Sequence, residues 1–174
     1  KGKDQTAISC VKMLNGNLFV TECLGLSGGY SDAVLERISR IARDNKINTI
    51  LIEQNFGGGM FAELLKPFLM RYHPCEVKDI RNTKTKELRI IDTLEPVMNS
   101  HRLIIDRKVI EKDFKSNPQE TPERRLKLQL IYQLSRLSRN KGSLVHDDLV
   151  DSMAGAVAYW TEYMAQTEDL NIAR

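Results

Sequence analysis

The sequence predicts a mixed α/β fold, in which an antiparallel hairpin and later parallel strands form a mixed sheet flanked by helices. Three observations predict it: two β-rich runs joined by an Asn-Gly turn, short apolar runs typical of buried strands, and amphipathic helical stretches that alternate with them. A chain of 174 residues is most simply one domain with a sizeable core. We therefore expect residues 1–174 to form a single domain.

The N-terminal third predicts a hairpin and a helix. The runs Thr6–Met13 and Asn17–Leu24 are rich in β-forming residues, and the Asn-Gly pair between them favours a tight turn. A loop with two glycines follows. Ser31 or Asp32 can then cap a helix that ends near Asn45, with apolar residues spaced to bury one face.

The middle of the chain predicts two strands with a helix between them. Asn48–Glu53 is a short apolar run that ends in an acid, as expected of a central strand. Asn55–Gly59 is a glycine-rich turn, Met60–Tyr72 is a helix that Pro67 must kink or split, and Cys75–Ile80 is the next strand.

The C-terminal half predicts mainly helices. We expect a helix over Lys84–Met98 with four inward residues, and a short strand over Leu103–Asp106. The inward residues are Leu88, Ile91, Leu94 and Val97. Arg107–Pro122 is charged and irregular, which indicates a surface excursion, and Arg124–Arg139 fits either a helix or an extended segment.

The last predicted element is a helix from Asp147 to about Ala165, with a tail that frays after Thr167. No apolar run is long enough to span a bilayer, and no signal-peptide pattern opens the chain. The three cysteines, Cys10, Cys23 and Cys75, are far apart. Cys10 and Cys23 lie in strand-like runs, which predicts buried thiols rather than a disulfide or a zinc site, and a reducing, intracellular compartment fits.

The most informative stretch runs from His146 to Val157. It contains three carboxylates in five positions, Asp147, Asp148 and Asp151, followed by small and apolar residues of helical character. On a helix these acids lie within one turn of each other, where their repulsion is relieved by a divalent cation. The alternative is an acidic helix N-terminus favoured by the helix dipole, with His146 as a capping or packing residue.

A fourth acid, Glu53, ends the predicted central strand just before the glycine-rich turn. Ligands of open α/β sheets bind beyond the carboxyl ends of the strands, so Glu53 is a candidate site residue, or simply an exposed acid where the strand ends. The turn is not a phosphate-binding loop of the Walker A type, because no Gly-Lys-Ser/Thr follows.

Basic residues gather in the middle of a chain with a net charge of +3. They include Lys78, Arg81, Lys84, Lys86 and Arg89. This distribution suits a polyanionic partner, although an ordinary solvated surface has similar runs.

Three segments together resemble the nuclease domain of a tailed-phage terminase large subunit, which has an RNase H-like fold. They are Gly2–Ala7, Ile50–Gly59 and Lys141–Ala154, of which the last is the most specific. The resemblance spans nearly the whole chain and is nearest to the enzymes of short-tailed phages.

The resemblance implies a metal-dependent endonuclease that cuts concatemeric double-stranded DNA into genome units. Glu53, Asp148 and Asp151 would be catalytic ligands of two Mg²⁺ or Mn²⁺ ions about 4 Å apart, with Asp147 and Asp4 near the same cluster. The family's first catalytic aspartate lies before the position of Lys1, so either the chain begins after it or Asp4 substitutes for it.

Lys84, Lys86, Arg89 and Arg81 would hold the DNA backbone. The resemblance further implies a longer viral packaging motor, with an ATPase domain that this chain lacks. This motor would act in the host cell cytoplasm, with a small terminase subunit and a portal as partners and without a membrane. The alternatives are a non-catalytic DNA-binding or assembly module of the same fold and an RNase H-like resolvase.

Overall fold

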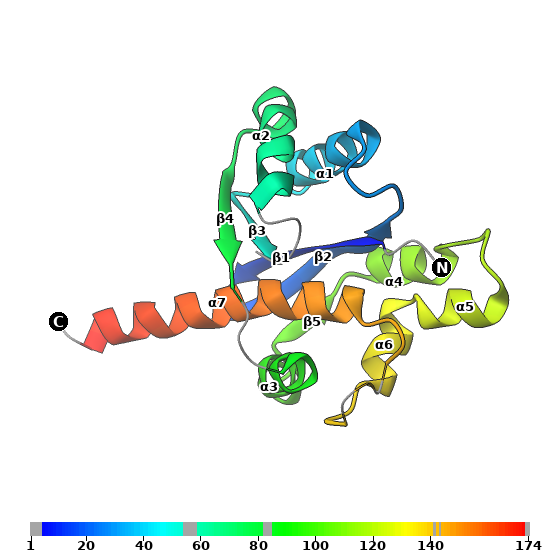
Figure 1. Ribbon diagram of the computed structural model, residues 1–174. Coiled ribbons are helices and arrows are strands. Elements are labelled where there is room, and N and C mark those ends of the chain that lie inside the picture. Colours follow the sequence, from blue (N-terminus) through cyan, green and yellow to red (C-terminus); the bar gives the residue numbers. More distant parts are fainter. Residues whose placement is uncertain (1–4, 54–58, 82–84, 141, 143, 173–174) are drawn as a thin grey trace. The chain divides into compact units, whose positions relative to one another are not determined.

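The computed structural model describes residues 5–53, 59–81, 85–140, 142 and 144–172, with side chains as far as residue 165. Strands and helices alternate along the chain, which confirms the predicted mixed α/β class (Figure 1). The chain forms two compact units. The first comprises residues 1–8 and 25–84, and the second comprises residues 9–24 and 85–174.

The first unit is built on two parallel strands, β3 (Thr49–Glu53) and β4 (Glu76–Ile80), paired so that Glu53 is opposite Ile80. Helices α1 (Asp32–Asp44) and α2 (Met60–Tyr72) pack against each other in the same unit. Their apolar faces form the core with β3. The core includes Val34, Leu35, Ile38, Ile52, Phe61, Leu65 and Leu69.

Helix α2 is not split at Pro67, contrary to one of the two predicted outcomes. Its buried residues Phe61, Leu65 and Leu69 are spaced four apart, so one apolar stripe continues past the proline. Packing of this stripe against the core holds the helix together where a backbone hydrogen bond is lost.

A second sheet has the order β1-β2-β5, with β1 (Thr6–Leu14), β2 (Asn17–Leu26) and β5 (Leu103–Ile105), and all of it except residues 6–8 and 25–26 belongs to the second unit. Asn15 and Gly16 join β1 to β2 with φ angles of 50° and 77°, as a primed hairpin turn requires. Strand β5 pairs parallel to β2. The predicted combination of a hairpin with a parallel strand is therefore confirmed.

The described part of the second unit contains the helices α3 (Lys86–Asn99), α4 (Arg107–Lys115), α5 (Pro122–Lys127), α6 (Leu130–Arg136) and α7 (Asp148–Ile172). The long helix α7 packs on α3 and α6 (Figure 1). Its first three turns bury a continuous apolar face. This face consists of Leu149, Val150, Met153, Ala154 and Val157.

Four expectations about the C-terminal half need correction. Arg107–Pro122 is not irregular, because α4 occupies its first half and the side chain of Asp106 accepts a capping hydrogen bond from the Lys108 amide (2.9 Å). Arg124–Arg139 is neither one helix nor a strand, since α5 and α6 divide it. Helix α7 continues to Ile172 instead of fraying after residue 167.

The fourth correction concerns α3. Leu88 is 38% exposed, and the buried face consists of Ile90, Leu94 and Val97. The apolar periodicity was compatible with two neighbouring faces, and the one that contains Ile90 is buried in the folded chain.

Cys10 and Cys23 are buried free thiols, as predicted, and Cys75 is a half-buried one. Burial raises the pKa of both buried thiols to about 12, so they stay protonated at neutral pH and act as small apolar side chains. Across the part of the chain that the structure describes, no helix is long and apolar enough to cross a membrane.

Candidate metal centre

The three predicted aspartates gather at the start of α7. Asp147 directly precedes the helix, and its carbonyl oxygen accepts the first helical hydrogen bond, from the Asp151 amide (2.9 Å). Asp148 and Asp151 lie in the first turn. The positive end of the helix dipole favours these charges, but three carboxylates in so small a space also attract cations.

A buried glutamine holds this helix start in place. The side chain of Gln133, only 1% exposed, accepts a hydrogen bond from the Val150 amide through Oε1 (3.1 Å). Its amide nitrogen donates to the Lys127 carbonyl oxygen (3.4 Å). Gln133 therefore satisfies one of the first-turn amides of α7 that have no partner within the helix.

The helix that carries Gln133 is itself fixed by a buried carboxylate. Asp113 on α4 accepts hydrogen bonds from the Leu130 amide (2.7 Å) and the Ile131 amide (3.1 Å) at the start of α6. Burial raises the pKa of Asp113, although these two hydrogen bonds oppose the shift. A chain of polar contacts thus runs from α4 through α6 to the aspartates.

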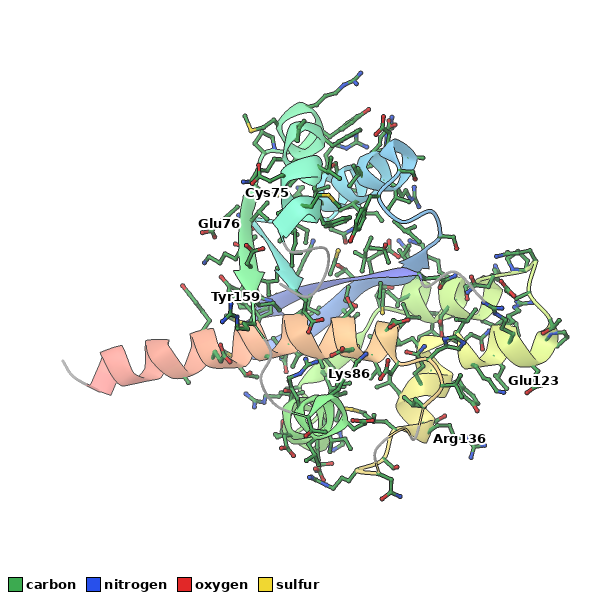
Figure 2. The ribbon with its side chains drawn as sticks, in the orientation of Figure 1. Cys75, Glu76, Lys86, Glu123, Arg136 and Tyr159 are labelled. Atoms are coloured by element: carbon green, nitrogen blue, oxygen red, sulfur yellow. The ribbon has the colours of Figure 1, made fainter. Side chains whose placement is uncertain are left out.

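Two cations of α3 contact the acidic helix start, and one of them, Lys86, is labelled in Figure 2. The ammonium group of Lys86 is 2.7 Å from Asp147 Oδ1 and 3.2 Å from Asp151 Oδ2. The guanidinium group of Arg89 is 2.7 Å from Asp151 Oδ1. The predicted DNA-binding residues Lys86 and Arg89 thus pair with two of the predicted metal ligands.

These contacts differ in exposure. The side chain of Arg89 is 14% exposed and that of Asp151 is 12% exposed, whereas Lys86 is 40% exposed. Burial alone would lower the pKa of Lys86, but its bonds to Asp147 and Asp151 outweigh burial and raise it. Lys86 is therefore charged at neutral pH while it bridges the two carboxylates.

Further contacts tie α3 to the segment before α7. The side chain of Glu87 accepts a hydrogen bond from the Gly142 amide (2.7 Å). Arg139 forms ion pairs with Asp92 (3.1 Å) and Glu95 (3.0 Å), which are both exposed. Exposed pairs add little stability each, but together with Lys86 and Arg89 they align α3 with the aspartates.

The remaining predicted site residues are distributed as follows. Glu53 ends β3 in the first unit and is half-buried, and Arg81 is exposed just after β4. Asp4, Lys84 and the glycines at positions 57 and 58 lie outside the described residues. Since Glu53 and the aspartates belong to different units, their participation in one site stays a prediction.

The donor set at the start of α7 fits a divalent cation. Carboxylate oxygens are the ligands that Mg²⁺ and Mn²⁺ prefer, and two positive groups already lie against two of these carboxylates. Among the described residues, no three His, Cys, Asp or Glu side chains converge as a complete metal-binding group. Asp147 and Asp151 are instead paired with the side-chain cations of Lys86 and Arg89.

Sequence reasoning found the aspartates but not their supports. Gln133 and Asp113 lie in segments that were expected to be ambiguous or irregular, so no signal singled them out. A lone buried glutamine or aspartate acquires its role only through elements distant in sequence. In retrospect, Asp106 before a charged amphipathic stretch was the available sign that α4 exists.

Comparison with known protein families identifies the class of protein to which this chain belongs. The family model described as "Terminase Bacteriophage T7, Ribonuclease H-like domain" matches residues 1–103. The mixed sheet flanked by helices is therefore an RNase H-like domain. The chain belongs to this family of phage terminases.

A relative extends the similarity to the aspartates at α7. Over all 174 residues, the chain is 37% identical to a protein named "Terminase, large subunit" from Enterobacteria phage T3. The chain spans 29% of the length of that protein. The predicted resemblance to a terminase large subunit is thereby confirmed.

Proposed function

We propose that this chain is the metal-dependent endonuclease domain of a viral DNA-packaging terminase large subunit, and that it cuts concatemeric double-stranded DNA into genome units. Membership of an RNase H-like terminase family supports the class. The observation that carries the proposal is the group of aspartates at the start of α7, held in a fixed position and already in contact with positive charge.

Asp148 and Asp151 would hold the metal, with Asp147 beside them and Glu53 as the remaining ligand from the first unit. Bound divalent ions supply an activated water and stabilise the charge that develops on the phosphate and leaving oxygen. The family resemblance places Asp4 or an upstream aspartate in the same set. We further propose that the two units act together as one nuclease domain.

The chain's own groups have distinct roles in this proposal. Arg89, largely buried, keeps Asp151 Oδ1 in a fixed orientation. Gln133 keeps the first turn of α7 from unwinding, and thereby fixes the spacing of Asp148 and Asp151. Preorganised ligands of this kind lose little entropy when they bind an ion or a transition state.

Basic residues on α3 and in the segment before it would bind the DNA backbone. Lys86 is the exposed member of the cation pair, and Arg81 and Lys84 precede it in the chain. Contacts to phosphates carry little sequence information, so cleavage should be weakly sequence-specific and binding should weaken steeply with salt.

The full-length setting is also part of the proposal. An ATPase domain, a small terminase subunit and a portal would be partners of the longer protein, which would act in the host cell cytoplasm. The curated relative is named as a large terminase subunit and is more than three times as long as the matched region, since this chain spans 29% of it.

A plasmid assay tests the proposed activity. Supercoiled plasmid is incubated with the domain and Mn²⁺, with Asp148→Ala, with Asp44→Ala as a matched control, and with EDTA. Asp44 is an exposed acid at the end of α1. We expect nicking and linearisation by the wild type and by the control, and none by Asp148→Ala or with EDTA. Equal cutting in all four reactions would refute the proposal.

A non-catalytic DNA-binding module is the second candidate. It is favoured by one observation, that Lys86 and Arg89 form ion pairs with Asp147 and Asp151. This module would bind duplex DNA but leave the plasmid supercoiled with Mn²⁺ or Mg²⁺, and the Asp148→Ala substitution would not change its behaviour.

A further inference from the structure

The ammonium group of Lys86 occupies a position that a cation of higher charge would also prefer. It bridges one oxygen of Asp147 and one oxygen of Asp151, at 2.7 and 3.2 Å. The other oxygen of Asp151 is bound by Arg89. An incoming ion that bridges Asp147 and Asp151 at these two oxygens therefore competes with Lys86 for them.

Lys86 and Arg89 differ in their freedom to leave. Arg89 is 14% exposed, so moving its guanidinium group would disturb the packing between α3 and α7. Lys86 is 40% exposed, and its flexible side chain starts from the first residue of α3. Its ammonium group can move into solvent without any change in the buried face of the helix.

A divalent ion and an ammonium group cannot share the same pair of oxygens. Their separation would be a few ångströms, and at that distance like charges repel strongly in a partly buried site. An ion that binds these two oxygens must therefore displace Lys86, and the displaced ammonium group stays beside the site, where a nucleic-acid phosphate would attract it.

From these contacts we infer that Lys86 is an exchangeable counter-ion: it neutralises Asp147 and Asp151 in the metal-free protein, leaves them when a divalent ion binds, and then contacts a DNA phosphate. The inference rests on the proposed nuclease function. It adds that metal binding raises the affinity for DNA, and DNA binding raises the affinity for metal, through one lysine. Without metal, Lys86 stays paired with Asp147 and Asp151 and is not available to DNA.

Metal affinity measured without DNA tests the first half. Mn²⁺ is titrated calorimetrically into the wild type, Lys86→Met, Lys86→Arg and the control Lys108→Met, which alters an exposed lysine of α4. Loss of the competing charge should tighten Mn²⁺ binding about tenfold in Lys86→Met, equivalent to about 1.4 kcal/mol. Lys86→Arg and Lys108→Met should stay within about twofold of the wild type, well below that tenfold change.

DNA affinity tests the second half. Binding of a short fluorescent duplex is measured by anisotropy with Ca²⁺ and with EDTA, at constant ionic strength. Ca²⁺ should tighten DNA binding by the wild type and by Lys108→Met, and the gain should shrink in Lys86→Met. A gain of the same size in Lys86→Met would overturn the DNA half of the inference.

The outcomes separate this inference from the proposed function. If Asp151→Ala abolishes Mn²⁺ binding while Lys86→Met leaves it unchanged or weaker, the metal site stands and the counter-ion role is wrong. If Mn²⁺ binds neither the wild type nor Lys86→Met, both the role and the proposed metal centre fail. Should Lys86→Met unfold, Lys86→Gln replaces it, and the same comparison applies.

Discussion

Replacing Gln133 with Met tests whether the start of α7 depends on one buried amide. Methionine has nearly the same length and shape but cannot accept the hydrogen bond from the Val150 amide (3.1 Å) or donate to the Lys127 carbonyl (3.4 Å). Gln133 is 1% exposed, so water cannot replace the lost partners without a local opening.

The expected loss follows from these two bonds. A buried amide left without an acceptor costs about 1–3 kcal/mol, and the longer bond to Lys127 contributes less. We therefore expect the free energy of unfolding to fall by about 2 kcal/mol, with a drop in Tm of about 4–8 °C for a chain of this size. Exposed Gln119, replaced with Met, should change stability by less than about 0.5 kcal/mol.

Two measurements check this prediction. Urea unfolding followed by circular dichroism gives the stability, and hydrogen exchange gives the local effect. The Asp151 amide, bonded to the Asp147 carbonyl, should exchange faster in Gln133→Met by more than the global loss explains, because the first turn of α7 frays. Unchanged stability together with unchanged exchange at Asp151 would show that Gln133 does not hold this turn.

Three further predictions concern the same unit. Burial raises the pKa of Asp113 in the folded protein, so ionisation of this group opposes folding. The free energy of unfolding of the wild type should therefore rise, relative to that of Asp113→Asn, as the pH falls from 7 toward 4. Urea unfolding at several pH values checks this direction. Trp160→Phe removes the bond from Nε1 to the Val11 carbonyl oxygen (2.9 Å) and should lower the free energy of unfolding by about 1 kcal/mol; a loss below about 0.3 kcal/mol in thermal unfolding would contradict it. Asp151→Asn should abolish Mn²⁺ binding in calorimetry, because the site loses a carboxylate ligand. Duplex binding in EDTA should persist, since the loss of a negative charge adds no repulsion toward the DNA phosphates. Mn²⁺ binding equal to the wild type would contradict this assignment.

Local chemistry made much of the fold predictable. The Asn15-Gly16 pair needs positive φ angles and selects the hairpin, and the apolar run that ends in Glu53 forms β3. The acids at 147, 148 and 151 were placed correctly at the start of a helix. These features depend on residues that are near each other in the chain, which is why a single sequence reveals them.

The remaining features depend on tertiary contacts. Leu88 and Ile90 are both apolar, and only the tertiary packing of α3 decides that Ile90 is the buried one. The pairing of Lys86 with Asp147 joins residues 61 positions apart, so it could not be read from either segment. Lys86 and Arg89, assigned to DNA, and Asp147 and Asp151, assigned to metal, are partners of each other.

The position of a bound Mn²⁺ ion is the most direct test of the account. Crystals of the domain grown with Mn²⁺ would be measured at the manganese absorption edge to locate anomalous peaks. We predict a peak within coordination distance of Asp148 and Asp151 carboxylate oxygens, about 2.0–2.2 Å, with the Lys86 ammonium group moved away from Asp147. A saturated crystal with no manganese at these aspartates would contradict the proposed metal centre.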